Sequence, residues 1–151
     1  MRLSYGATCF WTHAAGPLPE TDVTAFHRAC FAAARQADGR VADRTSTTAT
    51  PNFHTATIIC PHGEFAVLCH AHLPLTAFAA PLQDGQTQLT FTDPPAWAYI
   101  FEQATLRVLT LAELTTPVEQ VDMTDLAEVE HEQIRSWNPT NAGEVLFNWW
   151  D

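Results

Sequence analysis

The fold is decided by residues 55–71, which read Thr-Ala-Thr-Ile-Ile-Cys-Pro-His-Gly-Glu-Phe-Ala-Val-Leu-Cys-His-Ala. Two runs rich in β-branched and apolar residues, 55–60 and 65–71, flank the turn-forming segment 61–64. This arrangement predicts a β-hairpin in which Cys60 lies opposite Phe65. Because side chains alternate between the two faces of a strand, the hairpin and its extensions have two distinct faces. One is predicted to carry Ile58, Cys60, Phe65, Val67 and Cys69, and the other Phe53, Thr55, Thr57, Ile59, Ala66, Leu68, His70 and His72.

The segments on either side of the hairpin predict an α+β domain. We expect, in order, a strand at 3–11, a helix from about 22 to 38, a loop at 40–52, the hairpin, a second hairpin at 75–82 and 87–92, a short helix after 93, a strand at 106–111, a helix at 125–137 and a final helix from 141 to 151. Thr21 and Asp93 are the expected N-caps of the first two helices. The prediction is a mostly antiparallel sheet of about five or six strands with three to four helices packed on it, in a single globular domain over residues 1–151.

Composition and charge limit the classes of partner. The chain has 151 residues, is 46% hydrophobic and carries a net charge of −10, and all seven of its basic residues are arginine. Residues 61–151 hold thirteen acids and two arginines. This balance argues against binding to nucleic acid or to an anionic membrane surface and favours a basic protein partner. No apolar run approaches the ~18–20 residues of a transmembrane helix, and no signal peptide is recognised, so a cytoplasmic location is expected.

Motifs for catalysis are scarce in this sequence. The four cysteines form no Cys-x-x-Cys pair and lie in apolar runs, so we expect reduced, buried thiols rather than disulfides. There is no Gly-x-Ser-x-Gly elbow and no glycine-rich phosphate loop. No catalytic residue is therefore predicted, and the chain is expected to be non-enzymatic.

The pair His70 and His72 is the one candidate metal site. Two residues apart on a strand, their imidazoles point to the same face, which is a common start for a zinc or iron site. The remaining ligands would come from His54, His62 or Glu64. This interpretation predicts a metal-dependent hydrolase or lyase. Two histidines in a half-buried, hydrogen-bonded strand are the structural alternative, and no cofactor is the primary expectation.

The helix predicted at 125–137 has an acidic outer side. Asp125, Glu128 and Glu132 lie on it at helical spacing, whereas Leu126, Val129 and Trp137 form the apolar side. Glu130 falls at the edge of the buried arc, where a carboxylate needs a partner, for which we expect an arginine from the N-terminal half.

The C-terminal stretch 144–151 is rich in aromatic residues. Val145, Leu146 and Trp149 suffice to anchor one face of a short helix, which leaves Phe147 and Trp150 on another side. Either this helix is buried on two sides, which we expect, or an aromatic pair is exposed as an interface anchor.

These features predict a binding module for a basic protein, of an inhibitor, immunity or scaffold type. Asp125, Glu128 and Glu132 would provide electrostatic steering, and Trp149 and Trp150 the apolar anchor. The size, acidity and lack of catalytic motifs resemble those of small bacterial inhibitor or immunity proteins. Two further possibilities stay open: a homodimer through a sheet edge or the last helix, and a small-ligand pocket beneath the Thr-rich segment 45–52.

Overall fold

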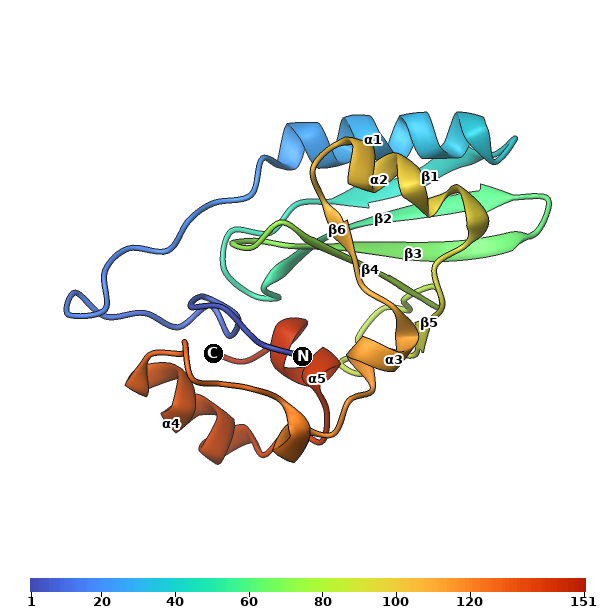
Figure 1. Cartoon of the computed structure of the whole chain (residues 1–151). Helices are drawn as coiled ribbons and strands as arrows, with labels where there is room; N and C mark the ends of the chain where they lie inside the picture. Colours follow the sequence, from blue (N-terminus) through green and yellow to red (C-terminus); the bar gives the residue numbers. More distant parts are fainter.

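The computed structural model describes residues 1–151 and contains one six-stranded sheet with helices on both faces (Figure 1). The strands are β1 (Arg40–Thr45), β2 (Phe53–Cys60), β3 (Gly63–His70), β4 (Leu75–Ala79), β5 (Phe91–Thr92) and β6 (Arg107–Val108). The first five follow the order β1-β2-β3-β4-β5 with antiparallel neighbours, whereas β6 pairs with β4 in parallel. The predicted α+β class with a mostly antiparallel sheet is confirmed.

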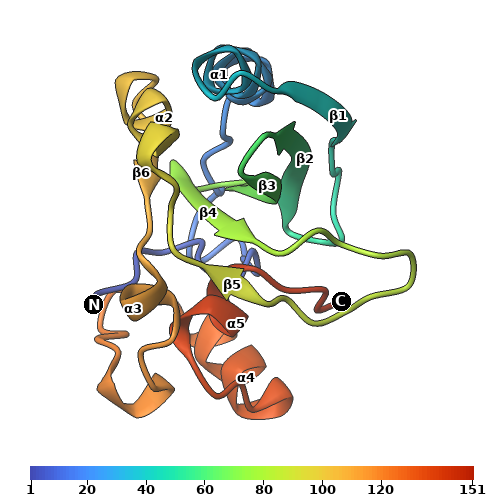
Figure 2. The same cartoon turned by 90° about the vertical axis from the view of Figure 1, so that its right-hand side faces the viewer.

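Five α-helices and two short 3-10 helices complete the fold. They are α1 (Val23–Gln36), α2 (Tyr99–Gln103), α3 (Leu111–Leu114), α4 (Glu128–Trp137), α5 (Ala142–Leu146) and the 3-10 helices η1 (Ala96–Ala98) and η2 (Val118–Gln120). α1 and α2 cover one face of the sheet, and α3, α4 and α5 lie on the other (Figures 1 and 2). No helix combines the length and apolarity needed to cross a bilayer.

The central hairpin confirms the predicted faces but not the predicted register. Its turn is the two residues Pro61 and His62, so that Cys60 pairs with Gly63 and Ile58 with Phe65. The predicted pairing is thus wrong by two residues. A shift of two leaves every side chain on its face, because the side-chain period of a strand is two.

A separate core lies on each face of this sheet. On the α1 side, the core consists of Ile58, Val67, Cys69 and Phe78, which pack against α1, Trp97 of η1 and Phe101 of α2. On the opposite side, Phe53, Leu68 and Ala77 pack against the N-terminal segment, α3 and α5. Both cores share one sheet, which supports a single domain.

Residues 3–11 do not form the predicted strand. Only the single bridge between Arg2 and Asp122 is of β type, and residues 5–9 form turns. Gly6 and Cys9 have positive φ angles of 100° and 71°. The main-chain N–H groups of Gly6 and Thr8 donate to the Glu130 side chain instead of to a strand.

The segment predicted as a loop at 40–52 begins with a strand, β1. This strand pairs only with β2 and lies at the edge of the sheet, so five of its six residues are exposed. An exposed edge strand needs no apolar period, which is why the sequence pattern missed it.

Several helix boundaries also differ from the predicted ones. Asp22 rather than Thr21 caps α1, by accepting a hydrogen bond from the Ala25 N–H at 3.0 Å. Asp93 accepts from the Leu111 N–H at the start of α3 and not from the helix that follows it. The last helix ends at Leu146 because residues 147–150 turn away to bond with the segment before β2.

Gly39 permits a close approach between the end of α1 and β2. The left-handed residue at this helix end is Asp38 (φ 55°), whereas a Cβ on Gly39 would lie 2.3 Å from the Ile59 carbonyl oxygen. We therefore expect Gly39→Ala to lower the free energy of unfolding by about 2–3 kcal/mol, as overpacking does. Urea unfolding of the wild type and the variant measures this difference in the free energy of unfolding.

Gly16→Ala is the matched control for Gly39→Ala. A Cβ on Gly16 meets nothing within 4 Å, so only its positive φ of 89° opposes the change, with a cost of about 1 kcal/mol. Equal losses in the two variants would contradict the role assigned to the Gly39–Ile59 approach.

Candidate functional site: the tryptophan groove

The C-terminal segment after α5 is held in place by Asn52 and Asn148. The Asn148 N–H donates to Asn52 Oδ1 at 2.8 Å, and the Asn52 N–H donates to the Asn148 carbonyl at 3.1 Å. Asn52 Nδ2 also donates to the Leu146 carbonyl at 2.9 Å. Both asparagines are buried. This network sets the positions of the two tryptophans that follow.

Trp150 stacks on Trp137 at the end of α4. The two indoles are parallel within 2°, and their centroids are 5.9 Å apart. Trp137 is 46% exposed. Trp149 meets the Phe53 ring edge-on at 5.1 Å. The C-terminal aromatic residues therefore differ in burial. Phe147 is buried as expected, whereas the side chain of Trp150 is partly exposed.

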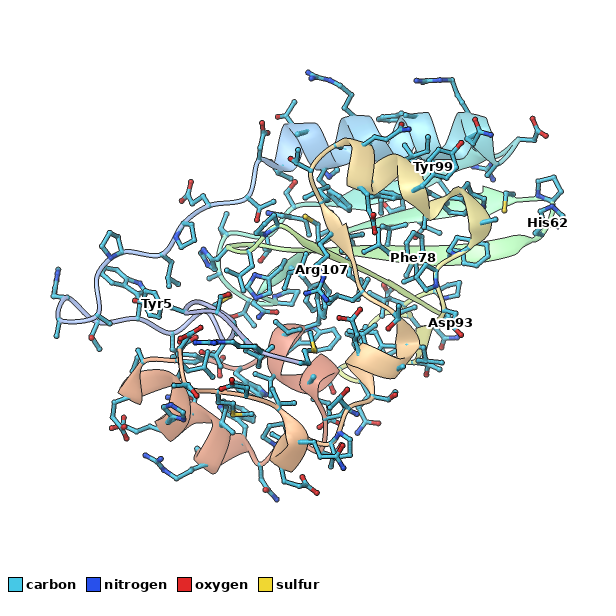
Figure 3. The ribbon with its side chains drawn as sticks, in the orientation of Figure 1. Tyr5, His62, Phe78, Asp93, Tyr99 and Arg107 are labelled. Carbon is cyan, nitrogen blue, oxygen red and sulfur yellow. The ribbon has the colours of Figure 1, made fainter.

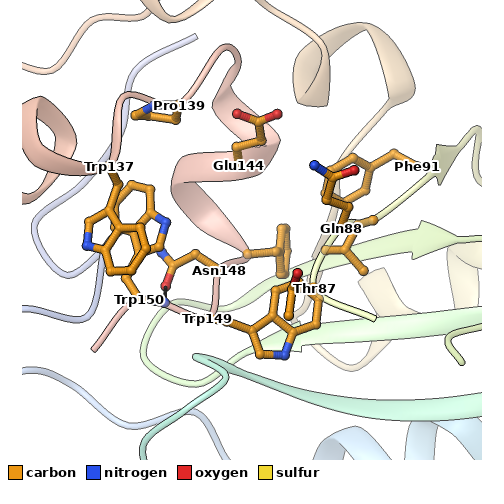
Figure 4. Close-up of a pocket in the computed structure, with 11 residues that line it drawn as sticks. Thr87, Gln88, Phe91, Trp137, Pro139, Glu144, Asn148, Trp149 and Trp150 are labelled. Carbon is orange, nitrogen blue, oxygen red and sulfur yellow. Dashed lines mark hydrogen bonds between the residues drawn. The ribbon is translucent and has the colours of Figure 1, made fainter. Parts of the chain in front are cut away.

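These side chains border a groove of about 500 Å³, which we call the tryptophan groove. Its walls come from α4, α5, the C-terminal segment and the loop before β5, and they include Phe91, Trp137, Glu144, Phe147, Trp149 and Trp150 (Figure 4). Glu144 is the one charged residue of the lining. Its carboxylate is oriented by the Thr140 N–H and hydroxyl, which donate to it at 2.6 and 3.0 Å, yet the residue remains exposed.

Two of the three predicted acidic contact residues already have arginine partners within the chain. Arg2 donates two hydrogen bonds of 2.8 Å to Asp125, and Arg135 donates one of 2.9 Å to Glu128. These hydrogen bonds lower the pKa of both carboxyl groups. Glu132 has no such partner.

The structure does not bring the acidic residues together with the tryptophans. Trp137 lies nine positions after Glu128, which at about 3.6 residues per turn is two and a half turns and puts the two side chains on opposite sides of α4. Glu132, five residues before Trp137, also faces away from the groove. Of the predicted contact residues, only Trp149 and Trp150 border the groove.

His70 and His72 bond to the main chain. His70 is fully buried, and its Nδ1 accepts from the His72 and Leu73 N–H groups at 3.1 and 3.0 Å. Its Nε2 therefore carries the proton and donates to the Ala7 carbonyl at 2.9 Å. His72 Nδ1 donates to the Pro19 carbonyl at 2.7 Å. No group of three or more His, Cys, Asp or Glu side chains is placed to hold a metal ion. In this conformation, His70 has no ring nitrogen free for one.

The prediction that an arginine pairs with Glu130 is wrong. Glu130 is fully buried, and its Oε1 accepts from the Gly6 N–H, the Thr8 N–H and the Thr8 hydroxyl at 3.1, 3.1 and 2.9 Å. Its Oε2 accepts from the Ala127 N–H at 3.1 Å. Main-chain donors replace the arginine because the N-terminal segment folds directly over α4.

The sequence pattern missed Trp137, Phe91 and Glu144 as site residues. The apolar pattern places Trp137 on the buried side of its helix, whereas its position just before Asn138-Pro139, where the helix stops, is the available signal of exposure. Phe91 and Glu144 belong to segments that meet only in the fold. All four cysteines are free; Cys30 and Cys69 are buried as expected, whereas Cys9 and Cys60 are only half-buried.

The groove offers indole faces, a carboxylate and no cationic side chain. An aliphatic chain ending in an ammonium or guanidinium group matches such a lining, because indole faces attract cations. The lining contains no cysteine, histidine or serine that could act as a nucleophile or base. No protein-family model matches the chain, and no curated protein or solved structure matches it significantly.

Proposed function

We propose that the chain is a non-enzymatic binding module of the cytoplasm that captures a basic segment of another protein in the tryptophan groove. The observation that carries the proposal is the stacked pair of Trp137 and Trp150 beside Glu144, in a lining without lysine, arginine or histidine. Partly exposed tryptophans are the residues that most often anchor a protein partner. The four free cysteines support a reducing compartment.

The charge of the C-terminal half supports a basic partner. Its two arginines are already paired, Arg107 with Glu113 and Arg135 with Glu128, and these two glutamates are among the thirteen acids of that half, so eleven further acids remain. A surface excess of negative charge raises the association rate of a basic partner even where the acids do not touch it. We therefore assign Asp125, Glu128 and Glu132 to steering and not to contact.

The proposal covers two modes of action. A module that seats a basic segment inhibits its partner when that segment belongs to the partner's working surface, as in an inhibitor or immunity protein. It acts as a scaffold when the segment lies elsewhere. Both modes use the same groove, so one binding experiment tests them together.

Trp137→Ala is expected to weaken the binding of a basic peptide about 10- to 30-fold, because a central tryptophan contributes about 2 kcal/mol. The probes are three fluorescein-labelled peptides of equal length, made of leucine with arginine, glutamine or glutamate. Fluorescence anisotropy measures their affinities. Only the arginine peptide should bind, and added salt should slow its association.

Tyr99→Ala provides the matched control. Tyr99 is 47% exposed, close to the value of Trp137, but lies on α2 across the sheet from the groove (Figure 3). It should leave the affinity unchanged. Equal binding of all three peptides, or an equal effect of the two substitutions, would overturn the proposal.

A further inference from the structure

A second hollow lies on the other side of Trp150. It has a volume of about 510 Å³ and is formed by the N-terminal segment, the loop before β2 and the C-terminal segment. We call it the N-terminal hollow. Its lining includes Trp11, Glu20, Thr48, His72, Trp150 and Asp151. It lies where the sequence left open a ligand pocket beneath the Thr-rich segment.

The polar groups around the N-terminal hollow favour a positive charge. Glu20 and Asp151 are exposed carboxylates of its lining, which contains no lysine or arginine. His72 also lines the hollow, and its Nδ1 donates to the Pro19 carbonyl. Thr48 forms no hydrogen bond through its hydroxyl within the chain and is free to accept one.

A third carboxylate stands directly behind the wall of the N-terminal hollow. Thr8 lines the hollow, and its N–H and hydroxyl both donate to the buried Glu130. Burial raises the pKa of the adjacent Cys9 to about 12, hydrogen bonding from Asn52 opposes this, and the charge of Glu130 raises it further. The Glu130 carboxyl group therefore lies one hydrogen bond behind Thr8, a residue that lines the hollow.

Aromatic side chains and a fixed backbone complete the N-terminal hollow. Trp11 is 48% exposed, and Trp150 belongs to both the hollow and the tryptophan groove. The wall is held by the bonds of Gly6 and Thr8 to Glu130 and by the Tyr5 hydroxyl, which donates to the Gly16 carbonyl at 2.6 Å. A wall that is already ordered lowers the entropy lost when a ligand binds.

We propose that the N-terminal hollow is a separate binding site for an organic cation, whose ammonium or guanidinium group lies against the indoles of Trp11 and Trp150 and the carboxylate of Glu20. Indole faces and carboxylates together are the pattern that recognises alkylated cations. The cation comes either from a free polyamine or from a lysine or arginine side chain. The site shares Trp150 with the tryptophan groove, whereas Trp11 and Glu20 line only the N-terminal hollow.

The test is a titration of the full ¹⁵N-labelled chain with four probes, followed by amide chemical shifts. The cationic probes are spermidine, Nα-acetyl-lysine methylamide and Nα-acetyl-arginine methylamide, and Nα-acetyl-norleucine methylamide is the uncharged analogue. The amides of Thr8, Cys9 and Thr48 should shift with at least one cationic probe and not with norleucine. Absence of shifts with all cations, or equal shifts with norleucine, overturns the proposal.

Two variants locate the binding group. Glu20→Gln and Trp11→Ala should each weaken cation binding roughly five- to tenfold, because each removes a direct attraction. Both residues are exposed, so the fold should tolerate the changes. Glu102→Gln, an exposed carboxylate of α2, is the control and should have no effect. An unchanged affinity in both Glu20→Gln and Trp11→Ala overturns the assignment.

The same titration separates the two sources of the cation and the two sites. Binding of spermidine alone identifies a free polyamine, whereas binding of the amino-acid derivatives identifies a side chain. Glu20→Gln should weaken these shifts while it leaves the binding of the arginine peptide at the tryptophan groove unchanged, because Glu20 does not line that groove. Failure of the N-terminal hollow is therefore distinguishable from failure of the proposed function.

Discussion

Glu130→Ala is expected to lower the free energy of unfolding by about 3–5 kcal/mol, because it removes the acceptor of several buried hydrogen bonds at once. The Glu130 side chain is fully buried and accepts four hydrogen bonds. Alanine leaves the N–H groups of Gly6 and Thr8 buried without an acceptor, and each such group costs about 1–3 kcal/mol. Urea unfolding measures the loss.

Two substitutions on the same helix test the reason for this loss. Glu130→Gln retains one oxygen for the donors of Gly6 and Thr8 but sets an amide NH₂ against the Ala127 N–H, so we expect an intermediate loss of about 1–2 kcal/mol. Glu132→Gln changes an exposed carboxylate and should stay within about 0.5 kcal/mol of the wild type. A loss below about 1 kcal/mol in Glu130→Ala would contradict the assigned role.

The stability of the protein is expected to fall between pH 6.5 and 4 because of His70. Burial lowers the pKa of His70 from 6.5 to about 4, while the bond to the Ala7 carbonyl opposes this and the charges of His72 and His54 add to it. Protonation of Nδ1 would also place an N–H against the two N–H groups that donate to it.

The sign of this pH dependence follows from proton linkage. Above pH 6.5 the His70 ring is neutral in both the folded and the unfolded chain, and the full stability is present. As the pH falls toward 4, the unfolded chain takes up a proton that the folded chain does not accept. Because each pH unit between the two pKa values corresponds to about 1.4 kcal/mol, His70 alone should remove about 3 kcal/mol.

His70→Asn isolates this contribution from that of other titrating groups. The Asn side-chain oxygen can accept from the His72 and Leu73 N–H groups but does not titrate and does not reach Ala7. The variant should be about 1–2 kcal/mol less stable at pH 7 and should lose less stability on acidification. Urea unfolding from pH 4 to 8 gives both curves. Parallel curves for the two proteins would show that His70 does not carry the effect.

Glu130 and His70 hold the same three residues from two directions. Glu130 accepts from the N–H groups of Gly6 and Thr8, and His70 donates to the carbonyl of Ala7 between them. The alternating pattern of residues 3–11 predicted a strand, whose main chain would bond to a neighbouring strand. The side chains of Glu130 and His70 provide these hydrogen bonds instead. They also order the wall of the N-terminal hollow, so their loss should weaken cation binding there.

The sequence by itself determined the two faces of the central hairpin, the long helix α1 and the α+β class. Each of these depends on a local period, of two residues in a strand and 3.6 in a helix, and a local period reports which side chains are buried. The face assignment survived an error of two residues in register for the same reason. The acidic C-terminal half is likewise a property of composition alone.

The tertiary structure alone decided the site. β1 is a strand because its main chain pairs with β2 at the edge of the sheet, although its own residues show no periodic pattern of apolar side chains. Glu130 is satisfied by a segment more than a hundred residues away. Trp137 and Trp150 meet because Asn52 and Asn148 turn the chain after α5 back toward β2. Partners so distant in sequence have no fixed spacing, so no period can reveal them, and only the packing of the whole chain brings them together.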